Sequence, residues 1–163
     1  GKPCAVSVPV LEPTIDRTLY HLIYLTRHAK GITVFMEASE KLDLVQRRTR
    51  AQAKQKKRED KSGQLELFSS ADWMPMEKHA DPAEVKLFWL DRLTNSPCQF
   101  GIEELADMLE ESAWFEGDLQ VAFGELAKEG KVKNLDATGK RRSKFVHFAE
   151  NQGKGEYLIK VLS

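Results

Sequence analysis

Several residue types that commonly carry chemistry are scarce in this sequence of 163 residues. The two cysteines, Cys4 and Cys98, lie far apart and in no Cys/His cluster, so the pattern favours neither a zinc site nor a disulfide framework. The four histidines stand at no metal-ligand spacing, and glycine-rich phosphate loops and a nucleophile elbow are missing. We therefore expect a noncatalytic chain with no metal and no cofactor, located in a reducing cytoplasm.

Long apolar runs are missing as well. No stretch approaches the roughly 18 residues that a membrane-spanning helix needs, and the N-terminus lacks the basic and then apolar pattern of a secretory signal. The sequence therefore predicts no membrane partner.

Charge is plentiful and strongly segregated. The chain balances 25 basic against 25 acidic residues, yet residues 46–61 carry a net charge of +6, residues 62–130 carry −11 and residues 131–163 carry +5. A polyanion is attracted to the first and last of these segments and repelled by the middle one.

The N-terminal residues predict a strand pair. Residues 5–11 alternate with β-branched side chains, and residues 19–26 form a nearly continuous apolar run of strand length. A turn-rich link joins them, so we expect an antiparallel hairpin within residues 1–30. Because two strands alone are marginally stable in water, the apolar side chains of the second strand need a covering surface, from this chain or in trans.

A helix is expected over residues 31–61. Phe35, Ala38, Leu42 and Val45 recur at helical spacing, which predicts one buried stripe. Good helix formers continue beyond Val45 without apolar side chains, which predicts a solvated basic extension.

This basic extension is the first candidate site. Nucleic acid is its natural partner, whereas the alternatives are a merely solvated helix face or pairing with the acidic residues of this chain or of a second copy. The candidate nucleic-acid-binding residues here are Arg47, Arg48, Arg50, Lys54, Lys56, Lys57 and Arg58.

Residues 62–80 are a predicted linker that contains a second candidate site. The pentapeptide QLELF, after a flexible Ser-Gly, resembles the motif by which bacterial polymerases and repair proteins dock on the sliding clamp. The alternative is that these side chains cover the next domain or pair as an edge strand. The candidate protein-binding residues are Gln64, Leu65, Leu67 and Phe68.

Residues 81–163 predict a winged helix-turn-helix domain. Asp81-Pro82 is a cap followed by proline at the first helical position. Three helices over 82–95, 101–109 and 118–127 are followed by three short strands over 132–135, 144–149 and 156–161, with extended chain at 99–100 between the first two helices. The expected fold class is thus α+β: a strand pair and a long basic helix, then a winged helix-turn-helix.

Such a domain suggests binding to a nucleic-acid duplex, with the wing contacting its phosphates. The exposed N-terminal end of the third helix is acidic, with Glu116 and Asp118, so base reading by this helix is disfavoured. The alternative is a winged domain used for protein interaction or dimerisation. The candidate residues of the wing are Lys140, Arg141, Arg142 and Lys144.

Three segments, 20–31, 34–36 and 63–68, together with the basic helix between the last two, resemble the C-terminal part of the three-Cys-motif partner proteins. Those bacterial proteins are similar to class I S-adenosylmethionine-dependent methyltransferases and are paired with a radical-SAM-like three-Cys-motif protein. Many end in a winged helix-turn-helix.

The resemblance implies that the strand pair corresponds to the last two strands of a methyltransferase sheet. The glycine-rich turn and acidic residue that hold the cofactor in that family are missing, so cofactor binding is carried onto no residue of this chain. The expected function is a noncatalytic C-terminal module that binds nucleic acid, with the sliding clamp or the three-Cys-motif protein as a protein partner. The alternative is a structural or homodimerisation appendage of a methyltransferase.

Overall fold

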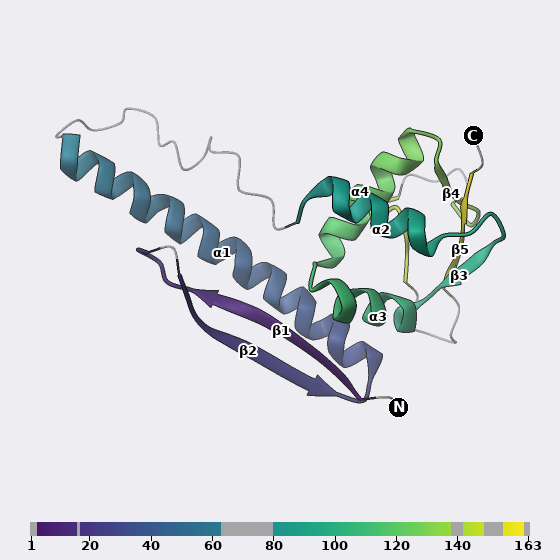
Figure 1. Ribbon diagram of the computed structural model, residues 1–163, viewed down its shortest axis with the longest axis horizontal. Coiled ribbons are helices and arrows are strands. Elements are labelled where there is room, and N and C mark those ends of the chain that lie inside the picture. Colours follow the sequence, from purple (N-terminus) through teal and green to yellow (C-terminus); the bar gives the residue numbers. More distant parts are fainter. Residues whose placement is uncertain (1–2, 16, 63–79, 138–141, 149–154, 162–163) are drawn as a thin grey trace.

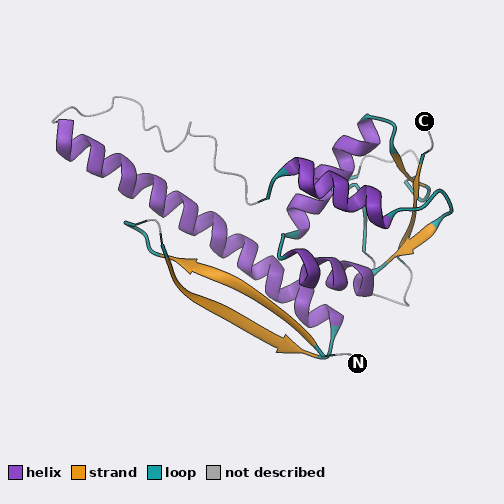
Figure 2. Cartoon of the chain, in the orientation of Figure 1, coloured by secondary structure: helices purple, strands orange, loops and turns teal. Residues whose placement is uncertain are grey.

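The computed structural model describes residues 3–15, 17–62, 80–137, 142–148 and 155–161. The described chain is a mixed α+β protein that begins with a strand pair and one long helix and continues into three shorter helices and a second small sheet (Figure 1, Figure 2). The elements are β1 Cys4–Leu11, β2 Thr18–Thr26, α1 Ala29–Ser62, α2 Pro82–Arg92, β3 Cys98–Phe100, α3 Ile102–Ser112, α4 Glu116–Lys128, β4 Val132–Asn134 and β5 Glu156–Lys160.

The expected hairpin is confirmed. β1 and β2 pair antiparallel, with Val6 opposite Tyr24 and Val8 opposite Leu22. The buried side of β1 faces α1, which lies along the hairpin (Figure 1). The ring of Tyr24 stacks on that of Phe35 from α1, with centroids 4.9 Å apart. One face of the sheet is thereby covered by the helix that follows it in sequence.

α1 is one continuous helix, but its buried stripe differs from the predicted one. Ile32, Met36 and Ser39 are buried, whereas Leu42 and Val45 are 43% and 60% exposed. Of the predicted stripe only Phe35 packs against the core. The reason is that α1 is packed by both the hairpin and α3, and these two neighbours select a face rotated from the predicted stripe.

The three shorter helices pack around Trp89. Its side chain is fully buried, its Nε1 donates to the carbonyl oxygen of Leu119 at 2.9 Å, and its ring meets those of Phe100 and Phe123 at 5.5 and 5.1 Å. The predicted cap is also present, since Asp81 Oδ1 accepts from the backbone N–H of Ala83 at 2.9 Å. Helices are found in all three places where the sequence predicts them.

The second sheet has the order β3-β5-β4, with both pairs antiparallel. Leu158 of β5 lies opposite Cys98 of β3 on one side and Asn134 of β4 on the other. The strand predicted over 144–149 is wrong for its described part, because residues 144–148 are not in a strand. Side chains, rather than a neighbouring strand, hold that segment.

The two halves of the described chain share one core. Buried side chains from the hairpin and α1 belong to the same cluster as those around Trp89 and Leu158. α3 forms the junction, because it contacts α1 and its Glu110 accepts from the backbone N–H of Ala5 at 2.9 Å. α1 is therefore fixed against the C-terminal half at its N-terminal end.

Candidate nucleic-acid interface

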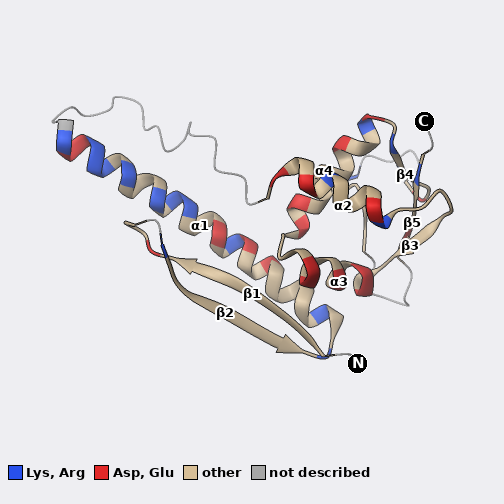
Figure 3. Cartoon of the chain, in the orientation of Figure 1, with Lys and Arg blue, Asp and Glu red and all other residues tan. Residues whose placement is uncertain are grey.

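The basic half of α1 extends beyond the body of the protein. Gln46 Oε1 accepts from the backbone N–H of Leu11 at 2.7 Å, close to the end of β1. Past that point the helix continues beyond the end of the hairpin, and Lys and Arg dominate its surface (Figure 1, Figure 3). Sixteen further residues at about 1.5 Å each give a cationic rod of about 24 Å. The exposed predicted site residues on this rod are Arg48, Lys54, Lys56, Lys57 and Arg58.

Arg47 stands apart from this exposed group. Its guanidinium lies 2.5 Å from Asp43 Oδ2, and the side chains of both residues are 18% exposed. This i,i+4 pair neutralises Arg47 at the point where the helix leaves the body. Arg50 is half-buried.

The two described cations of the predicted wing are also paired. Arg142 forms an ion pair with Glu156, and Lys144 Nζ lies 2.7 Å from Glu116 Oε1 of α4. Lys140 and Arg141 lie outside the described residues. Among the described residues, the predicted wing and the third helix therefore do not form a shared positive surface. The exposed positive charge of these residues lies mainly on α1.

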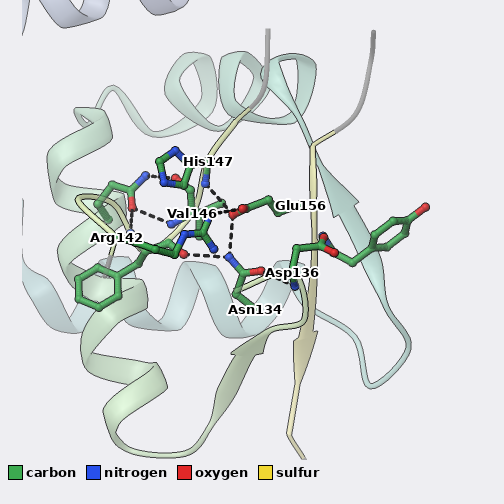
Figure 4. A network of polar contacts seen from close by, with 9 residues as sticks. Asn134, Asp136, Arg142, Val146, His147 and Glu156 are labelled. Carbon is green, nitrogen blue, oxygen red and sulfur yellow. Dashed lines mark hydrogen bonds and ion pairs between the residues drawn. The ribbon is translucent and has the colours of Figure 1, made fainter. Parts of the chain in front are cut away.

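Glu156 is the centre of a polar network that sequence reasoning missed (Figure 4). Its Oε2 accepts from the backbone N–H of His147 and from Asn134 Nδ2, both at 2.7 Å, while Oε1 pairs with Arg142. Burial alone would raise the pKa of this carboxyl, but the hydrogen bonds from His147, Arg142 and Asn134 outweigh it and hold the pKa below its usual range. The network fixes the loop that contains His147 and turns the side chain of Arg142 inward.

Gln120 of α4 explains why the strand predicted over 144–149 is not formed in its described part. Its Oε1 accepts from the backbone N–H groups of Phe145 and Val146, each at 3.0 Å, and its Nε2 donates to the carbonyl oxygen of Val146 at 2.6 Å. Asn134 Nδ2 donates to the carbonyl oxygen of Phe145 at 2.9 Å. The backbone groups that a strand would present to a neighbour are therefore bonded to side chains.

The acidic side chains at the N-terminal end of α4 make structural contacts within the chain. Asp118 Oδ2 accepts from the backbone N–H of Phe115 at 3.1 Å, and Glu116 pairs with Lys144. Glu40 of α1 also lies here, so close to Gly117 that a Cβ at that position would fall 2.2 Å from Glu40 Oε1. Carboxylates near a helix N-terminus interact favourably with the helix dipole.

A cavity of about 340 Å³ lies between α1, α2 and α4. Its lining is mostly apolar, with Val85, Phe115 and Ala122, and Glu40 and Asp118 are among its polar members. Carboxylates outnumber cations around it, so the cavity does not extend the positive surface of α1.

The pentapeptide over 64–68 lies outside the described residues. Within the described ranges no group of three His, Cys, Asp or Glu side chains is placed to hold a metal ion. In the same ranges no helix combines the length and apolar character needed to cross a membrane.

Comparisons with protein-family models, with curated proteins and with solved structures found no match to this chain.

Proposed function

We propose that this chain is a noncatalytic interaction module that binds nucleic acid through the basic half of α1. The observation that carries the proposal is the exposure of Lys54, Lys56, Lys57 and Arg58 on a helix that extends past the hairpin. Side chains of this kind neutralise phosphates and release counterions, which supplies affinity without sequence reading.

The proposed interface contacts phosphates and reads no bases. Residues 46–62 contain no aromatic side chain that could stack on an unpaired base. The paired state of Arg142 and Lys144 leaves Lys140 and Arg141 as the cations of the predicted wing that could add phosphate contacts. The helix, rather than the wing, is therefore the principal site in this proposal.

We infer that residues 81–163 form a winged helix-turn-helix domain. The element order α2, β3, α3, α4, β4, β5 and the sheet order β3-β5-β4 support this interpretation. A module of this kind in a methyltransferase-like partner protein of the three-Cys-motif type accounts for the sequence resemblance. Docking of residues 64–68 on a sliding clamp, or of this chain on the radical-SAM-like protein, stays a prediction.

A second candidate function is structural: the strand pair completes a larger sheet, in a methyltransferase-like domain or in a dimer. It is supported by the difference between the two outer edges of the hairpin. On β1 the N–H groups of Ala5 and Leu11 donate to Glu110 and Gln46, and Pro9 has no N–H. That edge is closed to another strand.

The outer edge of β2 is open, because its outward-facing backbone N–H groups have no partner among the described residues. Because the Ala5 N–H points away from β2, the register makes Leu25, Ile23 and His21 the β2 residues whose backbone groups face outward. Leu25 and Ile23 are 73% and 64% exposed. A long apolar strand with an open edge is a template for pairing with another strand, so this edge is where a sheet would continue.

A charge-reversal experiment tests the leading proposal and separates helix from wing. Labelled 20-base-pair duplexes of DNA and RNA are titrated into the wild-type chain, into Lys54→Glu/Lys57→Glu and into Lys140→Glu/Arg141→Glu. We expect the helix variant to lose roughly tenfold or more in affinity and the wing variant to lose less. Unchanged binding by the helix variant would overturn the proposal. Sheet completion predicts no duplex binding by any of the three.

A further inference from the structure

Apolar side chains are exposed on both faces of β2. Ile23 and Leu25 are exposed on the sheet face that points away from α1. Leu22 and Tyr20 are exposed on the face toward α1. Residues 18–26 contain no Asp, Glu, Lys or Arg, although natural edge strands commonly carry such charges to prevent pairing. The composition of β2 is therefore typical of a strand that is covered on both faces.

The exposed apolar residues of α1 lie on the side next to β2. Phe35 stacks on Tyr24 of β2. At 3.6 residues per turn, Leu42 and Val45 are rotated from Phe35 by about 20° and 80° around the helix axis. The buried Met36 is rotated from Phe35 by about 100° in the opposite direction. Leu42 and Val45 therefore lie beyond Phe35, away from the core.

The same residues of α1 are level with the middle of β2. α1 runs antiparallel to β2 along the hairpin (Figure 1). Phe35 contacts Tyr24 near one end of β2, and Gln46 accepts from Leu11 near the other end. The turns between these two contacts carry the exposed apolar residues of α1. They form one surface with β2, which we call the β2–α1 surface and which comprises Tyr20, Leu22, Ile23, Leu25, Leu42 and Val45.

We propose that a second copy of this chain covers the β2–α1 surface by pairing its own β2 antiparallel to this one. The inference rests on the second candidate function, in which the sheet continues, and not on nucleic-acid binding. The backbone groups that face outward belong to His21, Ile23 and Leu25. A two-fold axis at Ile23 places Ile23 opposite its own copy and Leu25 opposite His21. These pairs exchange about six backbone hydrogen bonds.

The difference between the two edges of the hairpin favours a closed dimer. The outer edge of β1 is closed by Glu110, Gln46 and Pro9, so each copy offers one edge and pairing stops at two chains. α3 contacts α1 and β1, so it lies on the side of the hairpin away from this interface. Among the described residues, the C-terminal half therefore leaves the outer edge of β2 accessible.

The charge of α1 is compatible with a second copy as the partner. The two-fold axis is perpendicular to the sheet, so the two α1 helices lie on the same face and run in opposite directions. Residues 46–61, with a net charge of +6 in each copy, then project from opposite ends of the dimer. This arrangement keeps the two basic segments apart, whereas parallel strands would bring them together. Leu42 and Val45 of each copy face the other across the new strand pair.

The interface is built on one strand pair and a few apolar side chains, and association costs translational and rotational freedom. We therefore expect a Kd of about 10 µM. The chain is then monomeric in dilute solution, with the β2 edge open, and dimeric when it is concentrated.

A matched pair of variants tests the interface. Ile23→Lys places a cation next to its own copy at the two-fold axis, whereas Leu87→Lys makes a similar change on α2. The two positions are 64% and 67% exposed, so neither change removes a core side chain, and circular dichroism checks the fold. Analytical ultracentrifugation between about 1 and 200 µM measures self-association. We expect the wild type and Leu87→Lys to dimerise equally and Ile23→Lys to associate roughly tenfold or more weakly.

Amide exchange of the unmodified chain is a second measurement. Over the same concentration range, exchange at Ile23 and Leu25 should slow several-fold, whereas exchange at Leu11, whose N–H donates to Gln46 within one chain, should not change. A chain that stays monomeric, equal association by the two variants, or assemblies larger than two chains would overturn the dimer. Slow exchange at Ile23 and Leu25 already in the monomer would instead reject the open edge, and with it the second candidate function.

Discussion

The side-chain amide of Gln120 bonds both backbone groups of Val146: Nε2 donates to the carbonyl oxygen at 2.6 Å, and Oε1 accepts from the N–H at 3.0 Å. This side chain pairs with an irregular segment as a neighbouring strand would. Val146 is fully buried beneath it. The C-terminal core is thus closed over α4 by a loop that the side-chain amides of Gln120 and Asn134 and the carboxylate of Glu156 hold in place.

Replacing Gln120 should release that loop. Gln120→Ala leaves the N–H and carbonyl groups of Val146 without these partners, and we expect the free energy of unfolding to fall by about 2 kcal/mol. Urea denaturation followed by circular dichroism measures the change. Gln52→Ala, at an exposed position of α1, is the matched control and should change stability by less than about 0.5 kcal/mol. Equal effects of the two substitutions would contradict the role given to Gln120.

Glu156 should make stability depend on pH in the acidic range. The hydrogen bonds from His147, Arg142 and Asn134 hold the pKa of Glu156 below the value of 4.5 that it has when unperturbed, despite burial. Because its pKa is lower in the folded state, its contribution is complete above the unfolded pKa and is lost as pH falls through the folded pKa. The unfolding free energy of the wild type should therefore fall more between pH 5 and pH 3 than that of Glu156→Gln, measured by urea titration at each pH. Parallel pH profiles would show that Glu156 is not the responsible group.

The two edges of the hairpin should differ in hydrogen exchange. The amides of Ile23 and Leu25 face outward from β2 without a partner in the described chain, whereas that of Leu11 donates to Gln46 at 2.7 Å. We expect Ile23 and Leu25 to exchange roughly tenfold or more faster than Leu11 in NMR measurements on the isolated chain. Slow exchange at Ile23 and Leu25 in dilute solution would mean that the β2 edge is already covered, for example by a second copy.

Much of the secondary structure could be predicted because it is encoded locally. The alternation over 5–11, the cap at Asp81 and the helical periodicity after it all depend on near neighbours in sequence. The buried stripe of α1 could not be chosen in this way, because Ile32 and Met36 on one face compete with Leu42 and Val45 on another. The choice is made by tertiary packing of the hairpin and α3 on α1, which the periodicity within the helix does not reveal.

The candidate site was predictable to a similar degree. A net charge of +6 over 46–61 indicates an exposed basic helix, and α1 has that arrangement. The pairing of Arg142 with Glu156 and of Lys144 with Glu116 spans 14 and 28 residues, so no local pattern reveals it. The same holds for Gln120, whose partners lie 25 and 26 residues away. Long-range side-chain bonds decide which cations of a basic sequence are available to a ligand.

The salt dependence of duplex binding by the unmodified chain tests the central claim most directly. If the exposed cations of α1 neutralise phosphates, a plot of log affinity against log salt for a 20-base-pair DNA duplex should be linear, with a negative slope of about 0.9 for each phosphate neutralised. Absence of binding at 50 mM salt, or an affinity that does not change with salt, would contradict the claim that α1 binds nucleic acid through its phosphates.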